Sequence, residues 1–137
     1  MKTLLRGGLS FIFVVAIATA TFAQANKEII VSAKYETIEN NYLAGINSNN
    51  HGLKVSSAYF LGDMKSHKAV IPLMKMFRNE KNDGAKLVAA WSLLKIGDSR
   101  GVFLVQRESE LGNCDGIRCM LGQLYQDYCL KTKGKID

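Results

Sequence analysis

The chain has 137 residues, which is enough for one domain of ordinary size. Hydrophobic residues make up 47% of it and charged residues 22%, and it contains a single proline. This composition is too apolar for an intrinsically disordered chain, so it predicts a globular protein.

The first stretch of the chain has the three parts of a secretory signal. Lys2 and Arg6 give a positive start, and an uncharged apolar run follows at 9–20. Small residues then stand at the positions that a signal peptidase reads, which predicts cleavage after Ala23 or Ala25. The run is shorter than the roughly 20 apolar residues of a spanning helix, so a cleaved signal is favoured over an uncleaved anchor or a buried helix.

Cleavage after Ala23 would leave 24–137 as the mature chain, periplasmic or secreted. Its net charge would fall from +6 to +4, because Lys2 and Arg6 leave with the signal. Such a mild positive charge favours acidic partners or surfaces only weakly, and by itself it does not indicate nucleic-acid binding.

Residues 24–51 are expected to form a helical cap. Apolar side chains recur at the spacing of one helical face, at Val31, Tyr35, Ile38 and Tyr42. Leu43 and Ile46 continue the pattern and predict a second, short helix. The polar run that follows, up to Gly52, is expected to close the cap.

A unit of 32 residues then repeats along the chain. The segment 52–55 (GLKV) recurs at 84–87 (GAKL) and again at 116–119 (GIRC). Self-similarity at a fixed period of this length is the signature of a repeat protein. The units are therefore expected at 52–83 and 84–115, and a lone first helix is expected at 116–130, before a charged tail that ends the region 116–137.

Each full unit predicts a helix, a tight turn and an antiparallel second helix. The first helices share a stripe with a small central residue, namely Val55, Ala58 and Leu61, then Leu87, Ala90 and Leu93. The second helices carry another stripe, namely Val70, Leu73 and Phe77, then Val102 and Val105. Gly97 and Asp98 mark the turn of the second unit, and Asp98 is expected to be a helix N-cap. One such hairpin cannot bury both of its faces, so the units must stack.

All three cysteines, Cys114, Cys119 and Cys129, lie near the C-terminus. Three reduced, mostly buried thiols are the favoured interpretation, and a local or intermolecular disulfide is the alternative. Ten helical residues separate Cys119 from Cys129 by about 15 Å, which is too far for a disulfide. Cys114 could reach Cys119 only from the loop before the helix. A metal site is disfavoured, because there is no C-x-x-C pair.

The two units resemble HEAT repeats. The second unit carries the pattern of this family most fully, at Lys86, Ala89, Ala90, Leu93, Ile96, Gly97, Asp98, Arg100 and Val102. The first unit departs from it at the turn, where Met64, Lys65 and Ser66 stand. The resemblance implies an all-α fold, a short right-handed α-α superhelix (an alpha solenoid) of about three antiparallel helix pairs. It also implies that the second helices line the concave face.

The candidate binding residues follow from this arrangement. The second helices are expected to carry a basic set, namely Lys68, Lys75, Arg78, Lys81, Arg100 and Arg107. An ordinary solvated polar face is the simpler interpretation of these residues. Trp91 shares its repeat position with Tyr59, and either packs between adjacent hairpins or serves as an exposed aromatic anchor.

No catalytic or cofactor-binding motif is evident, so the sequence predicts neither an enzyme nor a cofactor. The favoured function is a protein-protein interaction module or scaffold with a protein or peptide partner outside the cytoplasm. One alternative is an enzyme subunit, because repeats of this type resemble those of bilin lyases, and some related solenoids repair alkylated DNA. Another alternative is a binder of an anionic surface. The predicted export argues against the enzyme alternative.

Overall fold

The computed structural model describes residues 32–111 and 116–133. The predicted signal peptide, Val31 and Cys114 therefore lie outside the described residues. Within those two ranges the secondary structure is helical, without strands. The chain divides into two compact units, Met1–Ile38 and Glu39–Asp137, and the helices α2 to α6 all belong to the second.

The first described element is a single helix over 32–45. The prediction of a second short helix in this region is wrong: Leu43 continues the first helix, and Ile46 lies in the turn after it. The turn is closed by backbone hydrogen bonds from Asn47 to Ala44 (3.2 Å) and from Ser48 to Gly45 (3.0 Å). The residues that follow, 47–50, are all polar and have no apolar face that could pack as a further helix. The next helix therefore starts directly after them.

The first helices of the two repeat units start with the same kind of N-cap, an asparagine side chain. Helix α2 (His51–Asp63) begins after Asn50, whose side chain accepts a hydrogen bond from the backbone N–H of Leu53 (3.0 Å). Helix α4 (Asp83–Ile96) begins after Asn82, which accepts in the same way from Ala85 (2.9 Å). Asparagine satisfies an otherwise unpaired N–H of the first helical turn. Both helices therefore start one residue earlier than the glycines that open the predicted units.

The second helices of the units start differently. Helix α5 (Ser99–Glu110) follows Gly97, which has φ 77°, and Asp98, whose carboxylate accepts from the N–H of Arg100 (3.0 Å). The predicted turn and N-cap of the second unit are thus confirmed. In the first unit, a single turn of 3-10 helix, η1 (His67–Ala69), precedes α3 (Val70–Asn79).

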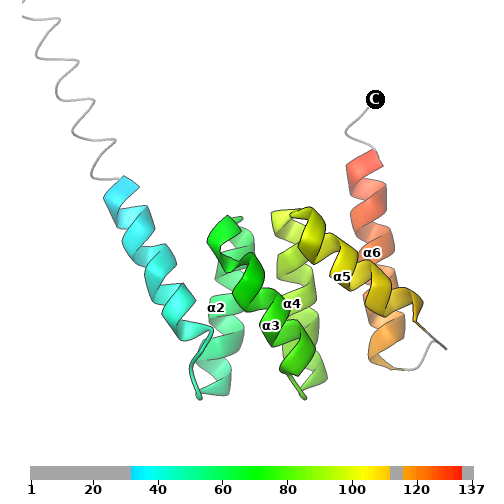
Figure 1. Ribbon diagram of the computed structural model, residues 1–137, viewed down its shortest axis with the longest axis horizontal. Coiled ribbons are helices and arrows are strands. Elements are labelled where there is room, and N and C mark those ends of the chain that lie inside the picture. The colour runs from blue at the N-terminus through cyan, green and yellow to red at the C-terminus, as the bar shows by residue number, and fades with distance from the viewer. Residues whose placement is uncertain (1–31, 112–115, 134–137) are drawn as a thin grey trace, which may run out of the picture. The chain divides into compact units, whose positions relative to one another are not determined.

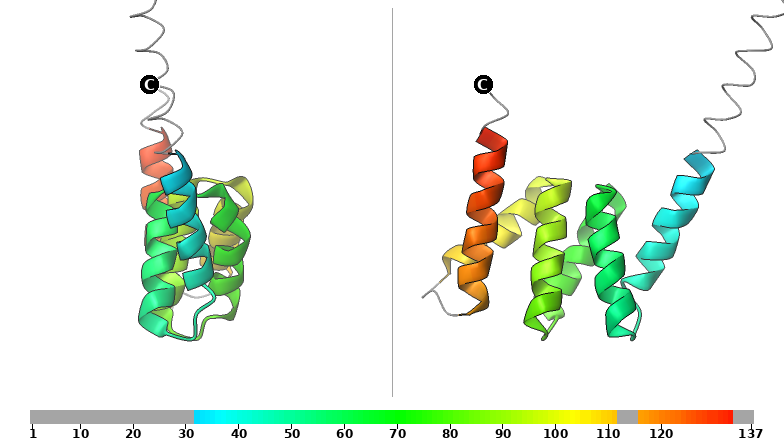
Figure 2. Two further views of the ribbon diagram at one scale, coloured as in Figure 1. Left: turned by 90° about the vertical axis from the view of Figure 1, so that its left-hand side faces the viewer. Right: turned by 180° about the vertical axis from the view of Figure 1, so that it is seen from behind.

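The last described helix, α6 (Ile117–Lys133), extends past the predicted end at Leu130. It packs on both α4 and α5, and α4 also contacts α2 and α3. Helices α2, α4 and α6 lie side by side in one layer, with α3 and α5 next to each other in a second layer (Figures 1 and 2).

The core lies between these two layers. Helix α2 buries Ala58 and Leu61, and α4 buries their counterparts Ala90 and Leu93, as the repeat predicts. From the second layer come Val70, Leu73, Phe77, Leu104 and Val105, all buried. No helix among the described residues is both long and apolar enough to cross a membrane.

Helices α2 and α4 make a close contact at Gly62 and Ser92. A Cβ atom on Gly62 would lie 2.6 Å from the Cα of Ser92, so only glycine fits there. The Ser92 hydroxyl donates a hydrogen bond to the carbonyl of Ala58 across the two helices (2.8 Å). This contact holds the first two helices of the layer together.

Candidate functional site

The outward side of the second layer carries a pattern that repeats between units. Ile71 on α3 and Phe103 on α5 are 32 positions apart, and Lys75 and Arg107 have the same relation. Ile71 is 58% exposed and Phe103 is 61% exposed. We call this set, together with Arg78, the α3/α5 face. Spacings of three and four residues put its members on the side of each helix away from the core.

The cations near this face differ in how they are engaged. Lys68 pairs with Glu39 (2.9 Å), and Arg100 pairs with Asp98 (3.0 Å). Lys75, Arg78 and Arg107 are exposed and make no ion pair within the described parts of the chain. The candidate cations without an ion pair among the described residues are thus Lys75, Arg78 and Arg107 of the α3/α5 face, together with the exposed Lys81.

Two of the predicted binding residues lie outside the second helices. Lys68 is in η1, before α3 begins, and Lys81 lies in the connection between α3 and α4. Both are exposed. The expectation that the second helices carry all six cations is therefore wrong for these two, because α3 starts only at Val70 and ends at Asn79.

Hydrogen bonds shift the pKa values of the carboxylates that engage these cations. The Arg100 guanidinium donates to both carboxylate oxygens of Asp98 (3.0 and 3.1 Å) and holds the pKa of Asp98 below its ordinary value. The hydroxyl of Ser66 and the ammonium of Lys68 similarly lower the pKa of Glu39. Both carboxylates are therefore negatively charged at neutral pH and hold their cations away from a partner.

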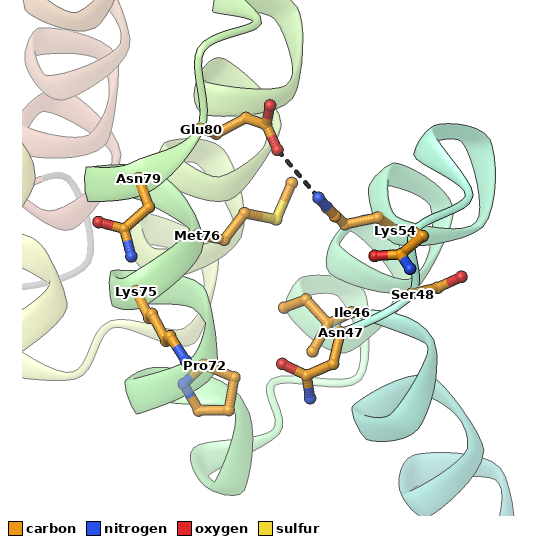
Figure 3. Close-up of a pocket in the computed structure, with 10 residues that line it drawn as sticks. Ile46, Asn47, Ser48, Lys54, Pro72, Lys75, Met76, Asn79 and Glu80 are labelled. Atoms are coloured by element: carbon orange, nitrogen blue, oxygen red, sulfur yellow. Dashed lines mark hydrogen bonds and ion pairs between the residues drawn. The ribbon is translucent and has the colours of Figure 1, made fainter.

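A pocket of about 210 Å³ lies beside the α3/α5 face (Figure 3). It is formed by the turn after the first described helix, the start of α2, and α3. Ile46 and Met76, both buried, point toward each other across it and form an apolar base. Lys75 and Asn79 line its α3 side, and Asn47 lies opposite. A side chain with an apolar stem and an acidic end would suit this lining.

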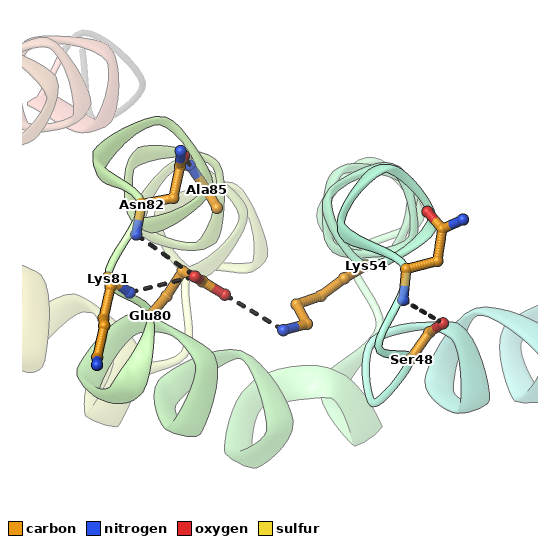
Figure 4. Close-up of polar contacts among 7 residues, drawn as sticks. Ser48, Lys54, Glu80, Lys81, Asn82 and Ala85 are labelled. Atoms are coloured by element: carbon orange, nitrogen blue, oxygen red, sulfur yellow. Dashed lines mark hydrogen bonds and ion pairs between the residues drawn. The ribbon is translucent and has the colours of Figure 1, made fainter.

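An ion pair closes one end of the pocket. Lys54 on α2 contacts Glu80, which follows α3 (3.3 Å). The other carboxylate oxygen of Glu80 accepts hydrogen bonds from the backbone N–H groups of Lys81 (3.1 Å) and Asn82 (3.4 Å), as Figure 4 shows. These bonds lower the pKa of Glu80 and fix its orientation. Lys54 is therefore held by the protein, and Lys75 is the unpaired cation among the residues that line the pocket.

Ile71 and Phe103 were not identified from the sequence as candidate binding residues, although the repeat contains a signal for them. The exposed apolar pair Ile71 and Phe103 is visible as a repeat match, but a matching apolar residue is normally assigned to the core. The pocket residues Asn47, Met76 and Asn79 come from separate segments, and only the tertiary structure brings them together.

Trp91 lies in the other layer, on α4. Its ring stacks on that of Tyr59 from α2, with the ring centroids 4.8 Å apart and the planes 2° apart. The Lys95 ammonium lies over the same ring, 4.7 Å from its centroid. This geometry fits the interpretation of a ring packed between adjacent helix pairs. Trp91 is not part of the α3/α5 face.

The described cysteines differ in their state. Cys119 is disulfide-bonded, whereas Cys129, further along α6, is a half-buried free thiol. The prediction of three reduced thiols is therefore wrong for Cys119, and the disulfide alternative applies to it. A hydrogen bond with the Cys129 thiol, together with burial, raises the pKa of Tyr125.

Among the described residues, no group of three or more His, Cys, Asp or Glu side chains could hold a metal ion. Comparison with family models, with curated proteins and with solved structures gives no match for this chain.

Proposed function

We propose that this protein is an exported, non-catalytic interaction module, built as a short HEAT-like solenoid, that binds an acidic and partly apolar segment of another protein. Export is supported by the signal-like composition of the first 23 residues, with Lys2 and Arg6 before the apolar run. The binding surface is the α3/α5 face with the pocket beside it.

Two observations support the solenoid. The first helices of successive units are neighbours in one layer, and the second helices are neighbours in the other. Equivalent positions also have similar roles: Asn50 and Asn82 cap α2 and α4. Lys54 and Lys86 each pair with a glutamate near the end of the following second helix, although these glutamates, Glu80 and Glu108, are not 32 positions apart. A helix pair that repeats its contacts in this way stacks as a one-dimensional array.

The repeated apolar-basic pair on the α3/α5 face carries the functional proposal. Isolated exposed apolar residues are common and need no explanation. Ile71 and Phe103, however, occupy the same position in two units, and a cation follows each one turn later, at Lys75 and Arg107. Packing does not require any of these four side chains, since they face away from the core. A partner that alternates apolar and acidic side chains would satisfy all of them.

The proposal is tested with labelled peptides of defined pattern and the full mature chain. A peptide that alternates Glu and Leu is expected to bind, as measured by fluorescence anisotropy. A Lys and Leu peptide should not bind, because it meets unpaired cations. A Glu and Ser peptide should bind more weakly, because it leaves Ile71 and Phe103 uncovered. Binding of the Lys and Leu peptide as tight as that of the Glu and Leu peptide would contradict the proposal.

Charge reversal locates the surface. Lys75→Glu and Arg107→Glu should each weaken binding of the Glu and Leu peptide by roughly fivefold, the effect of about 1 kcal/mol expected for an exposed ion pair that becomes a repulsion. Arg118→Glu is the matched control, because it makes the same charge change at an exposed position on α6, in the other layer. Equal losses in all three variants would mean that net charge, and not this face, determines binding.

Replacement of the apolar residues separates a protein partner from a plain anionic surface. Phe103→Ser should weaken the Glu and Leu peptide by roughly tenfold, because a buried aromatic anchor contributes on the order of 1–2 kcal/mol. The same variant should leave the binding of heparin, a sulfated polysaccharide without apolar groups, unchanged. If heparin binds more tightly than the peptide and Phe103→Ser alters neither, the anionic-surface alternative is correct.

A further inference from the structure

The contact between α4 and α6 differs from the contact between α2 and α4 at equivalent positions. Gly62 and Ser92, which meet where α2 and α4 touch, become Leu94 and Leu124 when counted 32 residues on. Two leucines cannot approach as closely as glycine and serine, so α4 and α6 must stay further apart at this level. Leu94 is 5% exposed and Leu124 is half-buried.

A pocket of about 100 Å³ lies between α4 and α6 at this place. Leu94 and Leu124 form part of its lining, with Trp91 from α4 and Tyr128 from α6. The lining is therefore aromatic and aliphatic. An engineered apolar cavity of about 150 Å³ accepts a benzene ring. This pocket is smaller but open to solvent, so a six-membered ring would be partly enclosed in it.

The rim of the pocket is charged but paired. Lys95 contacts Asp63 at 3.0 Å, and Lys131 contacts Asp127 at 2.5 Å. Each cation therefore has an anion beside it, and the rim offers no net charge to an ionic ligand. A ring that is uncharged, with at most a hydroxyl or an N–H group for the rim, matches this environment best.

The neighbouring helix pair shows the geometry that such a ring could adopt. The phenol ring of Tyr59 lies parallel to the indole of Trp91, at 4.8 Å between centroids. The equivalent position in the third unit is Gln123, which has no ring to continue the stack. Tyr59 thus stacks on the α2 side of the Trp91 indole, the Lys95 ammonium lies 4.7 Å from the centroid of the same ring, and the indole also lines the pocket that contacts α6.

We propose that the pocket between α4 and α6 seats a single uncharged aromatic side chain, such as tyrosine or phenylalanine, from a partner protein. Sites for free small molecules typically have volumes of about 300–1,000 Å³, so a pocket of about 100 Å³ is too small for one. An aromatic side chain in an apolar pocket with a polar rim is the usual anchor of a protein interface. This site is in the layer opposite α3 and α5, so it is tested independently of the α3/α5 face.

Trp91 is the single tryptophan of the chain, so its fluorescence reports directly on this pocket. The probes are blocked Gly-rich peptides with one central Tyr, Phe or cyclohexylalanine. The Tyr and Phe peptides are expected to change the Trp91 emission saturably. The cyclohexylalanine peptide has an equally apolar but saturated ring and should bind roughly 2- to 10-fold more weakly, because it lacks the aromatic stacking contribution.

Variants test the location. Leu124→Trp should fill the pocket and abolish the response, and Tyr128→Ala should abolish it by removing a wall. Leu130→Ala is the control, since Leu130 is on α6 but 71% exposed and outside the pocket. Helicity and melting temperature of each variant show that it is folded, and the two loss variants act by opposite changes in volume.

Three outcomes would overturn the proposal. The first is an unchanged Trp91 emission with both aromatic peptides at millimolar concentration. The second is equal binding of the cyclohexylalanine peptide, which would make the pocket merely apolar. The third is tighter binding of free p-cresol than of the Tyr peptide, which would make it a small-molecule site. None of these outcomes bears on the α3/α5 face, because no probe carries an acidic residue.

Discussion

The interface between α2 and α4 and the interface between α4 and α6 are built from equivalent positions of one repeat, yet they differ in closeness, and a pocket lies at the second. At the first interface, Gly62 and Ser92 let the backbones of the two helices come into contact, and the Ser92 hydroxyl donates a hydrogen bond from α4 to the carbonyl of Ala58 on α2. At the second, Leu94 and Leu124 take the same positions. We attribute the difference between the two interfaces to side-chain volume at this pair of positions.

Adding a methyl group at the interface between α2 and α4 should destabilise the protein strongly. In Gly62→Ala, the new Cβ would lie 2.6 Å from the Cα of Ser92, so α2 and α4 must separate and the Ser92 hydroxyl bond weakens. We expect the free energy of unfolding to fall by about 2–4 kcal/mol. Urea denaturation followed by helix ellipticity measures this change.

The matched control for Gly62→Ala makes the same substitution on α6, a helix of the interface between α4 and α6. Gly122 on α6 has no heavy atom within 4 Å of the position that a Cβ would take, so Gly122→Ala meets no steric barrier. It should stabilise the protein by about 0.5–1 kcal/mol, the intrinsic helix preference of alanine over glycine. Similar effects of the two substitutions would show that the two interfaces do not differ in closeness.

A smaller change tests whether the two units are equivalent at the starts of their first helices. Asn50→Ala and Asn82→Ala each remove the side chain that accepts a hydrogen bond at a helix start. Each should lower the free energy of unfolding by about 1 kcal/mol. Asn50→Asp and Asn82→Asp keep an acceptor and should leave stability within about 0.5 kcal/mol of the parent. Strongly unequal losses at the two caps would contradict the equivalence of the units.

The smallest expected effect is the dependence of the free energy of unfolding on pH. The pKa values of Glu39, Glu80 and Asp98 are all lowered in the folded protein by hydrogen bonds and ion pairs. A carboxylate whose folded pKa is depressed stabilises the fold above its unfolded pKa and loses that contribution as the pH falls through the folded value. We therefore expect a stability that is flat near neutral pH and decreases below about pH 4.5. Glu39→Gln should reduce this decrease, and an unchanged acid limb would contradict the assignment.

Much of the fold could be predicted from local sequence signals. The turn at Gly97 and Asp98 is encoded by a residue that tolerates positive φ and by a side chain that caps a helix, and the structure has both. The buried stripe of Ala58, Leu61, Ala90 and Leu93 also follows from spacing alone. These features depend on neighbours within one or two helical turns, so the sequence is sufficient to identify them.

The sequence-based predictions were wrong or incomplete where tertiary contacts determine the local structure. Leu43 and Ile46 have helical spacing, but the first described helix ends at Gly45 and Ile46 lies in the turn after it. Spacing alone does not reveal the backbone hydrogen bonds that form this turn. Lys68 lies in a 3-10 turn because the first unit has no Gly-Asp turn. The pocket between α4 and α6 depends on the mutual approach of two helices, and the sequence alone reveals the substituted pair but not the space it leaves.

Hydrogen-deuterium exchange of the chain from residue 24 onward, with and without the Glu and Leu peptide, shows whether the second helices form the binding surface. We predict slowed exchange in α3 and α5, because Ile71 and Lys75 lie on α3 and Phe103 and Arg107 lie on α5. Because this peptide contains no aromatic residue, α6 should show no change. Protection confined to α2, α4 and α6, or no protection anywhere at saturating peptide, would contradict a binding surface on the second helices.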